Sequence, residues 1–433
     1  MMDVAKEPGT SLLSFIMSAR HNQAARIFNI DVLTALIAIL LPWTTTGVAI
    51  VGALWVVALL PSIELRPLLR SLARPISILP IALFALALIG TLWSDAAWSV
   101  RLHAVSPTAK LLILPLLFYH CERSPRGIWV FKAFLVSCIA MVLVSCLVAF
   151  YPELSAKLYF SRGEYQVASG IFVKNYIDQS QEFALCAVAL VYPVMALWHA
   201  GKRRPAILLA AVAVAFVLSM LFVVVSRTTL VTIPIMLMVF ALLHLKLRTT
   251  LIAAGAAALF AGAIWFASPA LRQTVAKFYT DYQQTSEQIN PSGMGSRLEF
   301  WRKSLTFFAE KPLIGHGTGS TRGLFEKAGV GQIGYLSEVV GDPHNQTLNV
   351  AVQWGIVGVI LLWALWLTHL ALFRGDSLAA WVGLMVVVQN MLTSLFNSHL
   401  FDFHEGWMYV LGVGVAGGMV LRARAKAGTQ AEL

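Results

Sequence analysis

The stretch GIWVFKAFLVSCIAMVLVSCLVAFY, residues 127–151, is almost entirely apolar. A helix needs about 20 apolar residues to cross the hydrocarbon core of a bilayer. Similar runs recur along the chain, near residues 29–43, 46–61, 77–94, 103–120, 182–200, 205–225, 228–245, 250–268, 346–372, 378–398 and 406–422. The pattern predicts an all-α polytopic membrane protein with about 12 transmembrane helices. The first two runs are separated by only a few residues and form either two spans or one re-entrant pair.

Composition supports the same fold class. The 433 residues are 58% hydrophobic and 12% charged, and the mean hydropathy is +0.75, which is more than a soluble core needs. Residues 1–28 are polar, and no small-residue cleavage site follows them, so we interpret the first run as a retained span rather than a signal peptide. The four cysteines lie in or beside predicted spans, so neither a disulfide framework nor a zinc spacing is visible.

The charged residues test the order of the spans. With the N-terminus in the cytoplasm and the spans alternating, every short connection on one side is basic. The basic residues on that side are Lys6, Arg20, Arg26, Arg66, Arg70, Arg74, Arg123, Arg126, Lys202, Arg203, Arg204, Lys246, Arg248, Arg374, Arg422, Arg424 and Lys426. The opposite short connections, 95–101 and 399–405, carry one arginine between them. The net charge of +11 therefore indicates membrane topology rather than nucleic-acid binding.

This alternation also predicts the domain organisation. We expect cytoplasmic ends at residues 1–28 and 423–433. Helices 1–9 are predicted within 29–268, with an outer loop at 152–181, and helices 10–12 within 346–422. Between the ninth and tenth spans, residues 269–345 are predicted to form a helical periplasmic loop domain.

The long outer loop has helical patterns of its own. Apolar residues at helical spacing predict an amphipathic helix over 271–289 that lies on the bilayer: Leu271, Val275, Phe278, Tyr279 and Tyr282. A break follows at residues 290–293, which read NPSG. Ser296 and Glu299 fit a capping box, which predicts a second helix from Ser296 to about Lys311. Pro312 and the glycines at 315–319 end it.

Two arginines are candidates for binding an anion at the outer face. Arg227 lies between two apolar runs, and Arg297 lies in the first turn of the predicted loop helix, where a cation opposes the helix dipole. Guanidinium groups match phosphate oxygens bidentately, and an arginine at membrane depth is costly without a partner. The alternatives are a snorkelling arginine at Arg227 and an exposed loop arginine at Arg297.

His344 stands at the start of a predicted span. The ordinary pKa of histidine, about 6.5, suits a general base at neutral pH. The alternative is an interfacial histidine that caps a helix. His316, which is flanked by glycines, fits a structural or flexible role better.

Further polar residues lie on the other outer connections. Polar residues at the end of a membrane span are energetically costly, so we expect them to have a function. We expect Lys174 and Arg162 to help hold phosphate or sugar. Asn175, Gln179 and Asn345 are expected to bind sugar. The connection near residue 400 contains four residues of types that can ligate a metal, His399, Asp402, His404 and Glu405. Outer connections often contain such residues without binding a metal, so we expect no metal there. Signatures of nucleotide binding, serine hydrolysis and zinc proteolysis do not appear in a supporting context.

Three short motifs carry a resemblance to a known family. They are GSRLEFW at 295–301, PLIGHGTGS at 312–320, and HNQTL at 344–348 leading to GIVG at 355–358. With Val225-Ser226-Arg227 at the head of a middle helix and the large outer loop, the chain resembles the O-antigen ligase family, within a superfamily that also holds O-antigen polymerases and protein O-oligosaccharyltransferases. The similarity of organisation covers residues 30–420.

The resemblance implies an enzyme of lipopolysaccharide biosynthesis in the bacterial inner membrane, with its active site facing the periplasm. It implies metal-independent, inverting transfer of a polysaccharide from undecaprenyl diphosphate to a sugar hydroxyl of lipid A–core, with no nucleotide and no cofactor. Arg227 and Arg297 match the family's two arginines, and His344 matches its loop histidine.

Several other functions stay open on the sequence. A polymerase would use a second lipid-linked glycan as its acceptor, and a protein O-oligosaccharyltransferase would use a protein. A transporter would be expected to show repeat symmetry and broken, charged helices near the midplane. Here the polar residues gather at one outer face, which favours a surface enzyme over a transporter or a membrane scaffold.

Overall fold

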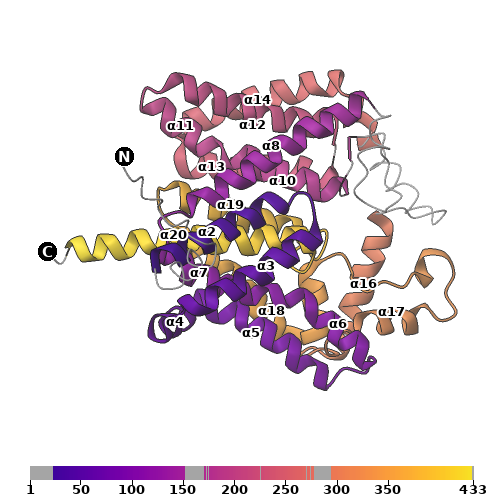
Figure 1. Cartoon of the computed structure of the whole chain (residues 1–433). Coiled ribbons are helices and arrows are strands. Elements are labelled where there is room, and N and C mark those ends of the chain that lie inside the picture. The colour runs from indigo at the N-terminus through magenta and orange to yellow at the C-terminus, as the bar shows by residue number, and fades with distance from the viewer. Residues whose placement is uncertain are drawn as a thin grey trace, which may run out of the picture.

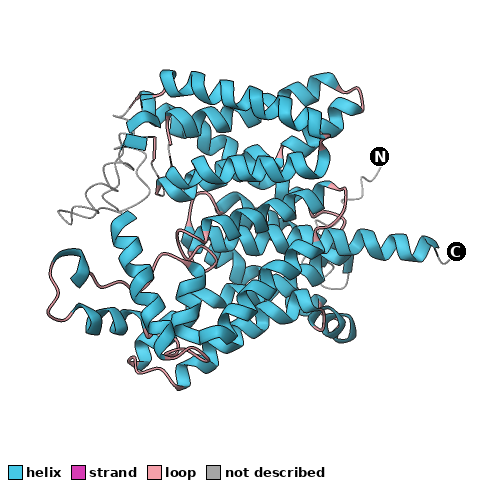
Figure 2. Cartoon of the chain, turned by 180° about the vertical axis from the view of Figure 1, so that it is seen from behind, coloured by secondary structure: helices cyan, strands magenta, loops and turns pink. Residues whose placement is uncertain are grey.

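The structure is a computed structural model that describes residues 23–151, 170–171, 173, 175–224, 226–269, 271–273, 275–276 and 294–431. Within these ranges the regular secondary structure is helical, with no strand (Figure 2). The predicted all-α fold is therefore confirmed. The predictions for residues 1–22, Arg162 and Lys174 concern residues outside the described part of the chain.

Ten helices or helix pairs in the described residues are long and apolar enough to cross a membrane. They are α2 (Gln23–Leu40), α3 (Thr45–Leu59) with η1 (Leu60–Ser62), α5 (Pro75–Ile89) with η2 (Gly90–Leu92), α6 (Trp98–Ala109) with η3 (Lys110–Leu112) and α7 (Ile113–Arg123), α8 (Ile128–Phe150), α10 (Tyr176–Ala189) with α11 (Val191–His199), α12 (Arg203–Phe222), α14 (Leu247–Ala267), α18 (Gln346–Leu372) and α20 (Phe403–Ala431). Two apolar helices are shorter, α13 (Arg227–His244) and α19 (Leu378–Thr393). Together these helices account for all the predicted spans.

The first two apolar runs form two separate helices rather than a re-entrant pair. Thr44 caps α3 by accepting a hydrogen bond from the Gly47 N–H at 3.2 Å, so the chain turns sharply after α2. The two helices then pack along each other, and the buried Trp55 donates to Thr34 Oγ1 at 2.8 Å.

α20 is the central helix of the bundle. It packs against α7 and α19, while α18 packs against α5, and α2 packs against both α3 and α8. A second group, α10 to α13, packs together and meets the first mainly through α19. The apolar window of α20 is 67% buried, whereas that of α14 is 0% buried, so α14 lies at the periphery.

The bundle has two chemically different ends (Figure 1). One end holds α4 (Leu65–Leu72), the C-terminal end of α20 and the basic connections, and we call it the basic face. At the opposite end α16 (Met294–Glu310) runs across the helix ends beside α17 (Thr321–Gly329) and η5 (Gly334–Ser337). We call this end the site face.

The second loop helix is confirmed as α16, but its predicted capping box is wrong. The helix already includes Met294, so Ser296 lies inside it rather than at its N-cap. The Glu299 carboxylate instead accepts two hydrogen bonds from Arg302, at 2.7 and 2.6 Å. This pairing lowers the pKa of Glu299. The predicted amphipathic helix over 271–289 falls largely outside the described residues, and α17 was not predicted.

The glycine motifs at 312–319 and 355–358 fit into each other. Gly355 has a φ of 61° and breaks α18, and the chain at 312–317 fills the break. The Ile356 N–H donates to the Pro312 carbonyl at 2.8 Å, and the Gly317 N–H donates to the Gln353 carbonyl at 2.8 Å. A Cβ at Gly355 would lie 2.3 Å from the Leu313 oxygen, so only glycine allows this contact. The motif therefore satisfies the backbone of a broken membrane helix and anchors the loop.

Candidate functional site

His344 is held in an unusual backbone conformation just before α18. Its φ is 55°, and no other non-glycine residue in the described part of the chain has a positive φ. Asp342 supports this turn, because its Oδ1 accepts from the His344 N–H at 2.9 Å and from Ser398 Oγ at 2.7 Å. Backbone strain of this kind often accompanies functional positions. Burial raises the pKa of Asp342, and the bond from Ser398 opposes that rise.

A chain of side chains leads from His344 to Asp402. His344 Nδ1 lies 2.8 Å from Asn397 Oδ1, and Asn397 Nδ2 donates to Asp402 Oδ2 at 2.8 Å. When Asp402 is ionised it only accepts hydrogen bonds, so the Asn397 amide nitrogen faces Asp402 and the amide oxygen faces the ring. In that state His344 Nδ1 carries the proton, and Nε2 keeps the lone pair that a base needs.

Arg297 on α16 belongs to the same cluster. The pKa of the buried His399 is lowered to about 3, by burial first and then by the charges of Arg297 and His344. Arg297 and His344 thus act electrostatically on the buried His399. The Phe300 ring, one turn along α16, has its centroid 6.1 Å from that of His344. Three segments distant in sequence thus meet at the site face.

The acidic side of the cluster is balanced by a lysine. Burial raises the pKa of Asp402 to about 7, the charge of Asp342 adds to the rise, and Lys110 opposes it. The Lys110 ammonium donates to the Phe401 carbonyl at 2.8 Å and also to the Asp402 carbonyl. Near neutral pH the Asp402 carboxyl is consequently close to its titration point.

α10 connects the cluster to the start of α13. Gln181 Nε2 lies 3.4 Å from His399 Nδ1, and Asp178 Oδ2 lies 3.7 Å from His404 Nε2. Thr229 Oγ1 donates to Ser180 Oγ at 2.8 Å. The first turn of α13, which begins at Arg227, therefore lies beside α10 at the same end of the bundle. The Arg227 side chain falls outside the described part of the structure.

The residues expected to bind sugar make protein contacts. Asn175 Oδ1 caps α10 by accepting from Ile177 N and Asp178 N, and Asn345 Oδ1 caps α18 by accepting from Leu348 N at 3.1 Å. Gln179 is buried and donates to Ser145 Oγ at 2.9 Å. These contacts position the helices that carry the cluster.

His316 is structural rather than flexible. It is buried, and its Nε2 lies 2.8 Å from the Phe307 carbonyl oxygen.

Sequence reasoning missed Asn397, Ser398 and Lys110. The signal was present, because polar residues are dense from Gln389 to Glu405, at the end of an apolar run. Such a density at membrane depth marks either a polar network or a site. Lys110 carries no such signal, since only the fold brings it to the Asp402 segment.

His399, Asp402 and Glu405 form a possible cation site, with ligand atoms within 4.8 Å of one another. Imidazole and carboxylate groups suit a divalent cation. Lys110, however, lies close enough to Asp402 and Glu405 to interact with both charges. The cluster therefore fits an internal ion pair as well as a metal.

Comparison with known protein families gives one match. Residues 212–363 match a family model described as O-antigen ligase. The matched segment contains Arg227, Arg297 and His344 and ends within α18, before Asn397 and Asp402. No curated protein matches the chain.

Proposed function

We propose that the chain is an O-antigen ligase, and the match of residues 212–363 to a family model described as O-antigen ligase supports this proposal. It transfers a polysaccharide from undecaprenyl diphosphate to a sugar hydroxyl of lipid A–core. The observation that carries the proposal is the chain of hydrogen bonds from His344 through Asn397 to Asp402, with Arg297 nearby, on one face of a multi-pass bundle.

In this proposal His344 activates the acceptor. Nε2 removes the proton from the acceptor hydroxyl as its oxygen attacks the anomeric carbon of the donor. Asn397 is a positioning residue, since it holds the tautomer in which Nε2 is free. Direct attack breaks the bond to the diphosphate oxygen and inverts the anomeric centre.

The leaving group requires positive charge. Undecaprenyl diphosphate departs with both electrons of the broken bond, and fixed cations aimed at those oxygens lower the barrier. Arg297 and Arg227 are assigned this role, with Lys174 and Arg162 as further diphosphate or sugar contacts. Asn175, Gln179 and Asn345 are assigned to positioning the helix ends, in view of their protein contacts.

The basic face supports a definite orientation. Basic connections favour the cytoplasmic side of a membrane. In the inner membrane, residues 1–28 and 423–433 would then lie in the cytoplasm. The loop domain 269–345 and the site face would lie in the periplasm. Both lipid-linked substrates would then reach the site from the outer leaflet.

The test is transfer in vitro. Purified full-length protein is mixed with undecaprenyl-diphosphate glycan and lipid A–core, with and without EDTA. We expect a glycan ladder on lipid A–core that EDTA does not reduce and that His344→Ala and Arg297→Ala abolish. The exposed His103→Ala and Arg322→Ala are matched controls that should keep the ladder.

Three outcomes would contradict this assignment. Lengthening of the lipid-linked glycan alone would indicate a polymerase, and glycan on protein would indicate an O-oligosaccharyltransferase. A ladder lost in EDTA and restored by a divalent ion would assign His399, Asp402 and Glu405 to metal binding instead.

A further inference from the structure

Lys132 is a charged residue inside a membrane-spanning helix. It lies on α8, one turn after the helix begins at Ile128 on the basic face, and its side chain is exposed. Among the described residues, Lys132 has no hydrogen bond and no ion pair. A lysine at this depth is costly unless a counter-charge lies nearby, and the described residues supply none.

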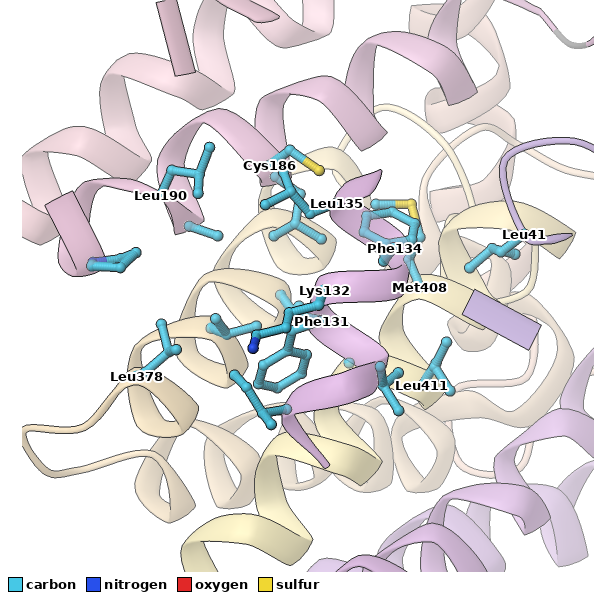
Figure 3. A pocket seen from close by; sticks show the side chains of 18 of the residues that line it. Leu41, Phe131, Lys132, Phe134, Leu135, Cys186, Leu190, Leu378, Met408 and Leu411 are labelled. Carbon is cyan, nitrogen blue, oxygen red and sulfur yellow. The ribbon is translucent and has the colours of Figure 1, made fainter. Parts of the chain in front are cut away.

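Beside Lys132 lies an apolar cavity of about 250 Å³. It lies between α8, α10, α11, α19 and α20, and Figure 3 shows the Lys132 nitrogen among its apolar side chains. Lys132 is the charged residue of the described lining, which is otherwise apolar and includes Phe131, Leu135, Ala189 and Leu209.

The cavity suits a hydrocarbon chain. An apolar cavity of about 150 Å³ already binds benzene and excludes water, and this one is larger. Phe131, Leu135 and Leu209 in its lining are only half-buried, so it opens to the outer surface of the bundle, where lipid lies. It also marks the seam where α8 meets the α10–α13 group.

Charge and depth identify the headgroup. Lipid phosphates lie at the level of the helix ends, within reach of a lysine one turn inside the helix. The same face also carries Lys202 and Arg203 at the start of α12, and the Arg203 guanidinium carbon lies 3.7 Å from the centroid of the Trp198 ring. The diphosphate of the glycan donor, by contrast, belongs at the opposite, site face.

We propose that this cavity binds an anionic phospholipid from the leaflet at the basic face, with an acyl chain between α8, α10 and α19 and its phosphate on Lys132. The lipid fills the seam and supplies the negative charge that the described residues do not provide for Lys132. This site is separate from the transfer site and does not depend on the proposed function.

The experiment measures lipids that stay with the full-length protein. Protein is reconstituted in nanodiscs of equal phosphatidylglycerol and phosphatidylcholine, released into detergent and analysed by native mass spectrometry. The wild type should retain phosphatidylglycerol over phosphatidylcholine by about fivefold, the preference expected for one lysine near a phosphate. Lys132→Gln should lose this preference, and Lys132→Arg should keep it.

Two further variants complete the design. Ala189→Phe should fill the cavity and reduce retention of both lipids, while Lys426→Gln, an exposed lysine of the same face, should change neither. Equal retention of the two lipids by the wild type would overturn the proposal, as would an unchanged preference in Lys132→Gln. Displacement of phosphatidylglycerol by added undecaprenyl phosphate would assign the cavity to the lipid carrier instead and would also overturn it.

Discussion

The two ends of the bundle each hold a buried cluster of charged and polar side chains, and the clusters differ in how completely they are paired. On the basic face, Asp31 accepts from His120 Nε2 at 2.7 Å and from Arg126 Nη1 at 3.4 Å, so both of its oxygens have partners. On the site face, the buried amide nitrogens Gln346 Nε2 and Asn390 Nδ2 have no hydrogen-bond partner among the described residues. A native protein rarely leaves such groups unsatisfied without a reason.

The difference supports the proposal that the cluster around His344 is functional and that the Asp31 cluster is structural. The Asp31 cluster is closed and joins α2 to α7, and the Trp55 ring covers its histidine edge-on. The cluster around His344 keeps a strained backbone, unpaired polar atoms and a histidine nitrogen with no assigned partner. Strain and unsatisfied groups of this kind are expected where substrate or water completes the network.

The largest expected effect is on stability at the basic face. Asp31→Ala leaves His120 buried without its partner, and breaking a buried pair in this way costs about 3–5 kcal/mol. We expect a clear fall in the thermal midpoint in detergent, with transfer activity per folded molecule unchanged. A stable but inactive Asp31→Ala protein would remove the contrast between the two clusters.

Arg297→Ala should have the next largest effect, and on activity rather than stability. Loss of one preorganised group that stabilises developing charge lowers the rate by about 10²–10³-fold. Arg297→Lys should recover only part of it, because an ammonium does not make the bidentate contact. The measurement is the initial rate of ladder formation, and full activity in Arg297→Lys would argue against bidentate binding of the diphosphate.

Asn397 variants sharpen the argument about the tautomer. Asn397→Ala should slow transfer by about 10–10²-fold, less than loss of the base itself. Asn397→Asp places a carboxylate on the ring, which favours the charged imidazole and moves the acidic limb of the pH–rate profile to higher pH. A profile that does not move in Asn397→Asp would show that this contact does not control His344.

The smallest expected effect is the pH dependence of stability at His399. Its folded pKa of about 3 is below the value of about 6.5 expected in the unfolded chain. The unfolded chain therefore binds the proton more readily than the folded chain. The contribution of neutral His399 to folding stability is fully present above pH ~6.5 and is lost as the pH falls toward the folded pKa. The thermal midpoint should decline below pH ~6.5, and less so in His399→Gln. Equal slopes would contradict this assignment.

The sequence allowed the helices to be predicted, because a bilayer requires long apolar runs and leaves few alternatives. The capping pattern at Ser296 gives a wrong prediction, because Ser296 lies inside α16 and Glu299 pairs with Arg302 in the structure. The pattern also did not show α17, a short helix whose Phe325 packs against Phe300 and Phe307 of α16.

The candidate site could be predicted only in part, for a physical reason. Arg297 and His344 stand out as polar residues in a loop between apolar runs. Asn397 and Lys110 act through contacts that span 53 and 291 positions of sequence, and no local pattern encodes them. The connection that holds Asp402 resembles an ordinary outer loop in the sequence, because only the fold brings its partners, Asn397 and Lys110, into place.

One paired measurement tests the central claim most directly: the transfer rate and the thermal midpoint of His344→Ala and His120→Ala, measured on the same purified samples. The account predicts that His344→Ala keeps its midpoint and loses transfer, while His120→Ala loses thermal stability and keeps its rate per folded molecule. Near-normal transfer by a folded His344→Ala protein would contradict the account.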